Sequence, residues 1–207
     1  MNILDFCERH QIHLISDEIY ACSVFDSGED AVPFTSILSI NVDRHIDPSR
    51  LHVIYGLSKD FGAAGLRIGA VITRSKSLLA AVDAVTRFSS ASGPSLAFGK
   101  LLLADRDWVH SFVDRNKATL AAAYKHVTTA LKEIGVKYIR GGNAGFFVYI
   151  DLSPFLPDHR VPEFELADRL QKAGVFLHPC EEHAPEPGWF RLVFTQDPRG
   201  VTEGIKR

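Results

Sequence analysis

The sequence has few cysteines, no long apolar run and no strong excess of either charge. Its 207 residues include Cys7, Cys22 and Cys180, an odd number without a CxxC pair. This pattern indicates neither a disulfide framework nor a paired-thiol metal site, and it favours a reducing compartment. No apolar stretch reaches the ~20 residues that a membrane helix needs. The first residues also lack the basic and apolar segments of a signal peptide, so we expect a cytoplasmic protein.

The charges are nearly balanced and evenly spread. There are 23 Lys and Arg residues against 25 Asp and Glu residues, which gives a formal net charge of −2, and no five or six like charges occur in a row. Nucleic acids and anionic membranes are bound by concentrated positive charge, so we expect neither as a partner. At 46% hydrophobic residues the composition is that of a globular protein with a real core.

Short apolar runs alternate with helical spacing in the first half of the chain, which predicts an α/β arrangement. Apolar runs predict strands at residues 13–16, 52–55 and 70–73. Spacing and capping residues predict helices at residues 3–10, 75–88 and 94–104. No internal repeat or low-complexity segment interrupts this order, so the chain is expected to fold continuously.

The pattern changes near Asp105, where we place a domain boundary between residues 1–105 and 106–207. A long helix is predicted from about Trp108 to Gly135, because apolar residues recur there every three or four positions. Strands are then expected at residues 136–139, 146–150, 175–178 and 190–194, with a helix at residues 162–172. A further helix starts at Asp197-Pro198. These elements predict a smaller α+β unit.

The densest group of reactive side chains is the segment YGLSKDFGAAGLRIGA, residues 55–70, between two predicted strands. A lysine in a dry turn, such as Lys59, can act as a nucleophile toward a carbonyl, whereas Ser58 and Arg67 can bind phosphate. The alternative is a tight glycine-rich connection whose Lys59 and Arg67 only face solvent. Composition alone leaves both interpretations open.

Two other strings carry polar groups at strand positions. In SDEIY, Asp17 can receive a ring N–H and Tyr20 a neighbouring polar atom, although Asp17 could instead cap a turn and Tyr20 pack in the core. In EPGWFRLVF, Arg191 can hold a carboxylate through two hydrogen bonds, or form an internal salt bridge. The segment HPCEEH, residues 178–183, lacks the paired spacing of a zinc site, and we expect no metal.

Four strings in this order (SDEIY, LSKDFGAAGLRIG, NAGFF and EPGWFRLVF) resemble the second half of class I/II aminotransferases, which are pyridoxal-phosphate enzymes of fold type I. The similarity is strongest to the branch that includes 1-aminocyclopropane-1-carboxylate synthases. It implies that residues 1–105 are the later part of the large cofactor domain. Residues 106–207 would then be most of the α+β small domain, truncated at its end.

The resemblance also implies roles for the residues around the cofactor ring. Lys59 matches the lysine that binds the cofactor covalently and later moves the Cα proton. Asp17 matches the aspartate that pairs with the pyridinium nitrogen, and Tyr20 matches the tyrosine that hydrogen-bonds the phenolic oxygen of the ring.

Further roles concern the anionic groups of cofactor and substrate. Arg67 matches the phosphate-binding arginine, with Ser58 as a helper, and Arg191 matches the arginine that binds the substrate α-carboxylate. Gly56 departs from the pattern, because the family often has a phosphate-contacting serine at this position, so weaker cofactor retention is expected.

The implied reaction is the conversion of an α-amino acid, by transamination or by a γ-elimination that closes a cyclopropane ring. A homodimer is implied for the complete enzyme. The upstream half of the family fold has no counterpart in these residues, so a second hypothesis is a truncated, non-catalytic protein that acts by association. On either hypothesis we expect the chain alone to be inactive, to retain no cofactor and to self-associate, because the neighbouring strands and the other side of the cofactor site are missing.

Overall fold

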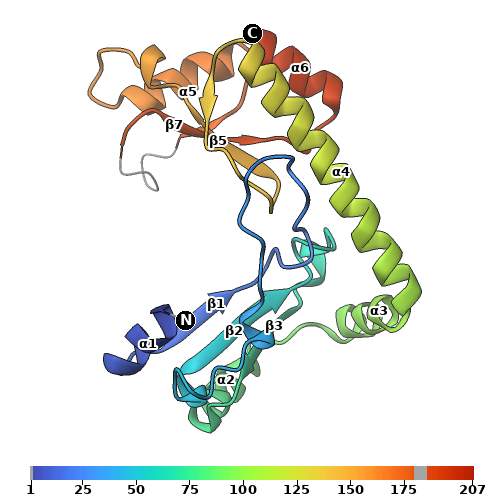
Figure 1. Ribbon diagram of the computed structural model, residues 1–207. Helices are drawn as coiled ribbons and strands as arrows, with labels where there is room; N and C mark the ends of the chain where they lie inside the picture. Colours follow the sequence, from blue (N-terminus) through green and yellow to red (C-terminus); the bar gives the residue numbers. More distant parts are fainter. Residues whose placement is uncertain (1, 180–185) are drawn as a thin grey trace. The chain divides into compact units, whose positions relative to one another are not determined.

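The computed structural model describes residues 2–179 and 186–207, which form two compact units (Figure 1). Unit 1 consists of Met1–Val24 and Pro33–Asp114, and unit 2 consists of Phe25–Val32 and Arg115–Arg207. The chain therefore changes unit three times. Within the described residues, no helix is both long enough and apolar enough to cross a membrane.

Unit 1 is built on a three-stranded sheet with the order β1-β2-β3. The strands are β1 (Leu14–Asp17), β2 (Leu51–Gly56) and β3 (Gly69–Thr73). β1 runs parallel to β2, whereas β3 is antiparallel to β2. All three strands coincide with predicted apolar runs, and those predictions are confirmed.

Three helices of unit 1 begin and end close to the expected positions. They are α1 (Asn2–Arg9), α2 (Lys76–Thr86) and α3 (Gly93–Ala104). The Ser75 hydroxyl accepts the Leu78 N–H at the start of α2, and Ser92 caps α3 in the same way. Each cap satisfies an amide that the helix itself leaves unpaired. A small core forms where α1 packs on the segment before β2, from Leu4, Cys7, Val42 and Ile46.

Unit 2 contains an antiparallel four-stranded sheet with the order β4-β5-β7-β6. Its strands are β4 (Lys137–Tyr138), β5 (Phe147–Asp151), β6 (His178–Pro179) and β7 (Trp189–Val193). Its helices are α5 (Pro162–Lys172), α6 (Pro198–Lys206) and the later part of α4 (Arg106–Glu133). Buried residues alternate along β5 and β7, because one face of the sheet packs on the helices.

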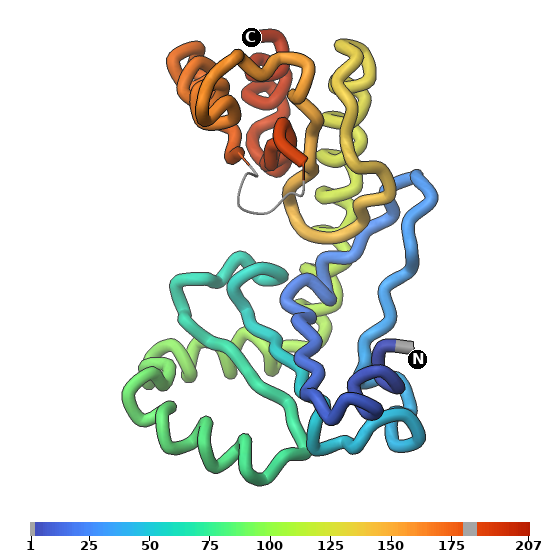
Figure 2. The backbone as a smooth tube through the Cα atoms, turned by 90° about the vertical axis from the view of Figure 1, so that its left-hand side faces the viewer, coloured from blue at the N-terminus to red at the C-terminus, as the bar shows by residue number. Residues whose placement is uncertain are grey.

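The core of unit 2 includes Phe25, from the segment Phe25–Val32, which precedes β2 in the sequence. Phe25 is buried beside Tyr124 and Phe194. The Phe25 N–H also donates to the Asn143 carbonyl over 2.8 Å. Figure 2 traces this blue segment beside the part of the chain near residue 140.

Two boundaries differ from expectation. The predicted strand at residues 175–178 was wrong for most of its length, because β6 covers only His178–Pro179. The Val175 N–H instead donates to the Leu170 carbonyl, after Gly174 has adopted a φ of +82°. This geometry ends α5 with a left-handed residue and keeps Val175 out of the sheet. The expected domain boundary near Asp105 falls at the break between α3 and α4, because α4 begins at Arg106, whereas the compact units divide inside α4, after Asp114.

Candidate functional site

The topology of unit 1 gathers three ionisable side chains at one edge of its sheet. Asp17 is the last residue of β1, and Lys59 follows the end of β2 by three residues. Because β1 and β2 are parallel, both chain segments leave the sheet at the same edge. β3 is antiparallel to β2 and starts there, with Gly69 opposite Gly56, so Arg67 precedes that start.

The three charged residues are solvent-exposed, whereas Ser58 and Tyr20 are half-buried. The Asp17 carboxylate accepts the Ile19 N–H over 3.2 Å, so it caps the turn after β1. One expected alternative for Asp17 was such a cap. A capping carboxylate has a second oxygen, so this bond is compatible with a role toward a ligand.

Arg67 adopts an unusual backbone conformation for an arginine. Its φ is +53° and its ψ is 40°, in the left-handed region, at the end of the short helix Ala64–Leu66. Its guanidinium donates to the Ala64 carbonyl over 3.2 Å. Glycine takes this conformation without steric cost, whereas other residues lose about 1 kcal/mol or more. An arginine at such a position points to a role for its side chain.

Two buried carboxylates next to these residues did not emerge from the sequence. Glu18, which is 6% exposed, accepts hydrogen bonds from the Ser36 hydroxyl over 2.6 Å and from the Ile37 N–H over 2.8 Å. Asp60, which is 1% exposed, lies directly after Lys59. The sequence shows an acidic residue directly after Asp17 and after Lys59, but it does not show which groups donate hydrogen bonds to these carboxylates.

Asp60 accepts two hydrogen bonds from the turn after β1, far away in the sequence, and one from β2. The donors are the Cys22 N–H over 2.8 Å, the Ser23 hydroxyl over 2.5 Å and the Tyr55 hydroxyl over 2.8 Å. Burial raises the pKa of Tyr55 above its usual range, and the hydrogen bonds to Cys22 and Asp60 raise it further. Tyr55 therefore stays a protonated donor at neutral pH.

Gly56 has a packing reason for lacking a side chain. A Cβ atom there would lie 3.0 Å from the Ile68 carbonyl oxygen and 3.4 Å from Cδ1 of Ile19. A serine at this buried position would require the neighbouring backbone to move. The close packing of this turn thus accounts for the glycine at the position where the family often has a phosphate-contacting serine.

Arg191 lies in β7 of unit 2, a different unit from Lys59. Its backbone is opposite Tyr149 of β5 and His178 of β6. The guanidinium carbon lies 5.2 Å from the centre of the Phe147 ring, a cation–π geometry that orients the side chain. The described part of the chain offers Arg191 no ion pair, in contrast to the internal salt bridge considered above.

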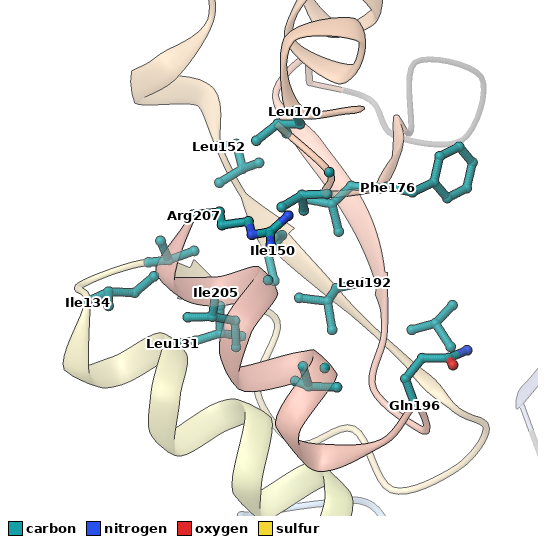
Figure 3. Close-up of a pocket in the computed structure, with 18 residues that line it drawn as sticks. Leu131, Ile134, Ile150, Leu152, Leu170, Phe176, Leu192, Gln196, Ile205 and Arg207 are labelled. Atoms are coloured by element: carbon teal, nitrogen blue, oxygen red, sulfur yellow. The ribbon is translucent and has the colours of Figure 1, made fainter. Parts of the chain in front are cut away.

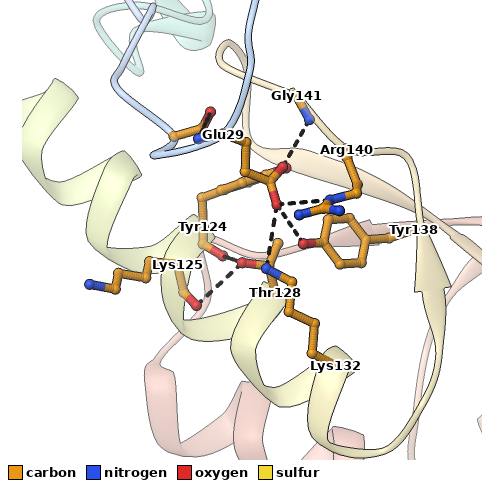
Figure 4. Close-up of polar contacts among 9 residues, drawn as sticks. Glu29, Tyr124, Lys125, Thr128, Lys132, Tyr138, Arg140 and Gly141 are labelled. Atoms are coloured by element: carbon orange, nitrogen blue, oxygen red, sulfur yellow. Dashed lines mark hydrogen bonds and ion pairs between the residues drawn. The ribbon is translucent and has the colours of Figure 1, made fainter.

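Unit 2 also contains a polar cluster around Glu29, whose side chain is 9% exposed (Figure 4). The carboxylate accepts the Tyr138 hydroxyl over 2.6 Å, the Tyr124 hydroxyl over 2.9 Å and the Gly141 N–H over 2.8 Å. Burial opposes ionisation, but these hydrogen bonds outweigh it and lower the pKa of Glu29 to about 2. The cluster attaches the segment Phe25–Val32 to unit 2.

A cavity of about 420 Å³ lies in unit 2 between the end of α4, the sheet and α6 (Figure 3). Its walls are mostly aliphatic, including Leu131, Ile150 and Leu192. Its one charged lining residue among those described is Arg207, which donates to the Ala173 carbonyl. Because no convergent polar groups line it, the cavity does not resemble a catalytic site.

No group of metal-ligating side chains is present within residues 2–179 and 186–207. Most of the HPCEEH segment cannot be judged, because residues 180–183 lie outside the described residues.

Comparison with solved structures defines the class of this fold. A double mutant of the aspartate aminotransferase of Thermus thermophilus matches 99% of the chain with a TM-score of 0.81 and 21% sequence identity. The chain covers 49% of that structure. The mixed α/β fold is therefore that of part of an aspartate aminotransferase.

Sequence comparison then identifies the family. Residues 1–207 match the family Aminotransferase class I and II, and the chain belongs to it. Members of this family typically depend on pyridoxal phosphate.

Curated relatives are longer than this chain. The 1-aminocyclopropane-1-carboxylate synthase-like protein 1 of Bos taurus is 35% identical over 99% of the chain, which spans 40% of that protein. The probable inactive 1-aminocyclopropane-1-carboxylate synthase-like protein 2 of Mus musculus is 36% identical over 93% of the chain and is covered to 33%.

Proposed function

We propose that this chain contributes the lysine-bearing half of a pyridoxal-phosphate site that converts an α-amino acid, most simply by transamination. The observation that carries the proposal is the gathering of Lys59, Asp17 and Arg67 at one sheet edge. The ends of β1 and β2 and the start of β3 bring together a carboxylate, an amine and a guanidinium.

The chemistry of this set fits the cofactor group by group. Pyridoxal phosphate has an aldehyde, a basic ring nitrogen and a phosphate. An amine binds an aldehyde covalently, a carboxylate pairs with a protonated ring nitrogen, and a guanidinium binds phosphate through paired hydrogen bonds. Lys59, Asp17 and Arg67 would supply these groups, with Tyr20 and Ser58 as hydroxyl donors to the ring oxygen and the phosphate.

When bound, pyridoxal phosphate supplies an electron sink for the negative charge that develops at Cα of the substrate. Asp17 keeps a proton on the ring nitrogen by offering it a negative charge. The Lys59 amine would then be the base that removes the Cα proton. Arg191 would bind the α-carboxylate of the substrate through paired hydrogen bonds.

Two products are compatible with the same first step. In transamination the substrate would give up its amino group to the cofactor and take an oxygen from water, which leaves a keto acid. In the other route a bond would form between Cα and Cγ as the leaving group departs from Cγ, which gives a cyclopropane amino acid. The resemblance of the bovine relative supports the second route, and the family as a whole supports the first. Homodimerisation belongs to this proposal for the complete enzyme.

The alternative is a non-catalytic protein that acts through association. Two observations favour keeping it. The chain spans about 40% or less of the relatives described above, and one of them carries the name probable inactive. In unit 1, many large apolar side chains are exposed on α2, α3 and β3.

The test is cofactor retention followed by product analysis. The purified chain is incubated with pyridoxal phosphate and desalted, and visible absorbance and bound phosphate are measured for wild type and Lys59→Ala. Absorbance that depends on Lys59, together with keto acid formed from an amino acid, supports transamination. A chain that loses all cofactor during desalting, even when it is supplied with the upstream half of the family fold, contradicts the catalytic proposal and favours the alternative.

A further inference from the structure

We infer that Asp60 is a positioning residue, which ties the turn after β1 to the turn after β2 and so fixes Asp17 relative to Lys59. The inference deepens the proposed function and rests on it for the roles of Asp17 and Lys59. It concerns a residue that contacts other residues of the chain and acts on the site through them.

The environment of Asp60 requires its carboxylate to be fully hydrogen-bonded. At 1% exposure the side chain has almost no water to solvate its charge. A buried carboxylate without partners is costly, and one that accepts several hydrogen bonds is stable. Its two oxygens accept from one backbone N–H and two hydroxyls, Oδ2 from Cys22 and Tyr55 and Oδ1 from Ser23.

The origin of the donors gives Asp60 its connecting role. Cys22 and Ser23 belong to the turn after β1, which also carries Tyr20 and follows Asp17. Asp60 belongs to the turn after β2 and is bonded covalently to Lys59. The paired positions of β1 and β2 end at Asp17 and Ile54, so the carboxylate links the two chain segments beyond the end of the sheet.

Tyr55 completes the tie from within β2. Its hydroxyl donates to Asp60 over 2.8 Å and lies 3.6 Å from the Cys22 sulfur. The same phenol thereby contacts both turns. A loss of the carboxylate would leave three donors without their acceptor inside the protein, and the two turns would be free to separate.

A graded set of variants separates positioning from general stability. Asp60→Ala removes all three bonds. Asp60→Asn keeps most of them, because the Ser23 hydroxyl can turn to accept from the new amide while the amide oxygen accepts from Cys22 and Tyr55. Tyr55→Phe removes one bond. Glu18→Ala is the matched control, since it removes a buried carboxylate that holds Ser36 and Ile37 instead of the Lys59 turn.

The first measurement is amide hydrogen exchange of the 207-residue chain without cofactor. In Asp60→Ala, residues 20–24 and 57–63 should exchange faster together, by roughly tenfold or more, because one tie protects both turns. Asp60→Asn should lie close to wild type. Glu18→Ala should instead accelerate exchange at residues 36–39. Unchanged exchange in either turn of Asp60→Ala, or acceleration spread over the whole chain, would overturn the inference.

The second measurement is a double-mutant cycle on pyridoxal phosphate affinity. In an otherwise wild-type chain, Asp60→Ala should weaken cofactor binding by roughly tenfold. In an Asp17→Asn background the weakening should be smaller by a factor of at least about three, because the effect of Asp60 acts through the position of Asp17. Equal effects in both backgrounds would overturn the positioning role. If the wild-type chain binds no cofactor even when it is supplied with the upstream half of the family fold, the proposed function fails, and the exchange measurement alone decides whether the tie exists.

Discussion

The two units of the chain differ in how much apolar surface they bury. Among the described residues, unit 2 has a core cluster of eleven buried side chains that runs from Phe25 to Phe194. The cluster of unit 1 has four, between α1 and the segment before β2. Yet unit 1 holds every candidate cofactor residue. Unit 2, with the larger core, holds Arg191, the residue assigned to the substrate carboxylate. Unit 1, with the smaller core, holds the residues assigned to the cofactor and to proton transfer.

The helices of unit 1 show where the missing burial lies. On α3, Leu96, Phe98 and Leu101 are exposed, and among its described residues only the small Gly99 is buried. Apolar surface of this extent is normally covered by another part of the protein or by a partner. The shorter span of this chain relative to its relatives is consistent with that need. The residues of a site and the residues that cover the apolar surface around it can therefore lie in different segments of a protein.

The comparison predicts its largest effect in the core of unit 2. Phe190 is 0% exposed, whereas Phe98 in unit 1 is 56% exposed. Phe190→Ala should lower the free energy of unfolding by about 3–5 kcal/mol, and Phe98→Ala by less than about 0.5 kcal/mol. Urea unfolding followed by circular dichroism measures both. Similar losses for the two variants would show that unit 1 buries its apolar face after all.

A second prediction concerns the attachment of Phe25–Val32 to unit 2. Glu29→Gln should cost about 3 kcal/mol at pH 7, because the buried hydroxyl and amide donors lose an ionised acceptor. The pKa of Glu29 is lowered to about 2 in the folded chain, below its usual value of 4.5. Its stabilisation is therefore fully present above pH 4.5 and is lost as the pH falls toward 2.

The matched control for Glu29 is Glu165, which pairs with Arg169 on the surface of α5 over 2.9 Å. Glu165→Gln should change stability by less than about 0.5 kcal/mol. Unfolding free energies from pH 7 to pH 3 test both variants. A Glu29→Gln deficit that stays constant as the pH falls would refute the ionised cluster.

A third prediction tests the substrate role of Arg191. Arg191→Lys should reduce kcat/KM for amino acids by roughly 10- to 100-fold, or ~1.4–2.8 kcal/mol, because lysine cannot form the paired hydrogen bonds of a guanidinium. The visible spectrum of bound cofactor should stay unchanged. An unaltered kcat/KM would make Arg191 a structural residue of the sheet.

The smallest expected change in unfolding free energy is for substitutions on α3 that alter the oligomeric state of the chain. The 207-residue chain should form oligomers in light scattering, because the apolar side chains of α3 are exposed. Replacing Phe98 and Leu101 with Gln should shift the population toward monomer, with less than about 0.5 kcal/mol change in unfolding free energy for each. A wild-type chain that is monomeric at high concentration would contradict this prediction.

Local signals explain what the sequence could predict. Apolar runs located the three strands of unit 1, and Pro94 at the first turn located α3. The resemblance implied that Asp17 and Lys59 belong to one site, and the parallel pairing of β1 and β2 brings both to the same edge of the sheet. The buried links could not be predicted, because they join distant positions. Asp60 bonds Cys22 across 38 residues, and Glu29 bonds Tyr138 across 109. No local pattern encodes such pairs.

The central claim is that Lys59 is the residue that binds pyridoxal phosphate covalently. The direct measurement is borohydride reduction of the chain, supplied with the upstream half of the family fold and incubated with the cofactor, followed by peptide mapping. Borohydride fixes the cofactor to whichever amine holds it. The account predicts one labelled peptide, with the label on Lys59, and loss of that label in Lys59→Ala. Stoichiometric label on another lysine, or equal label in Lys59→Ala, would contradict it.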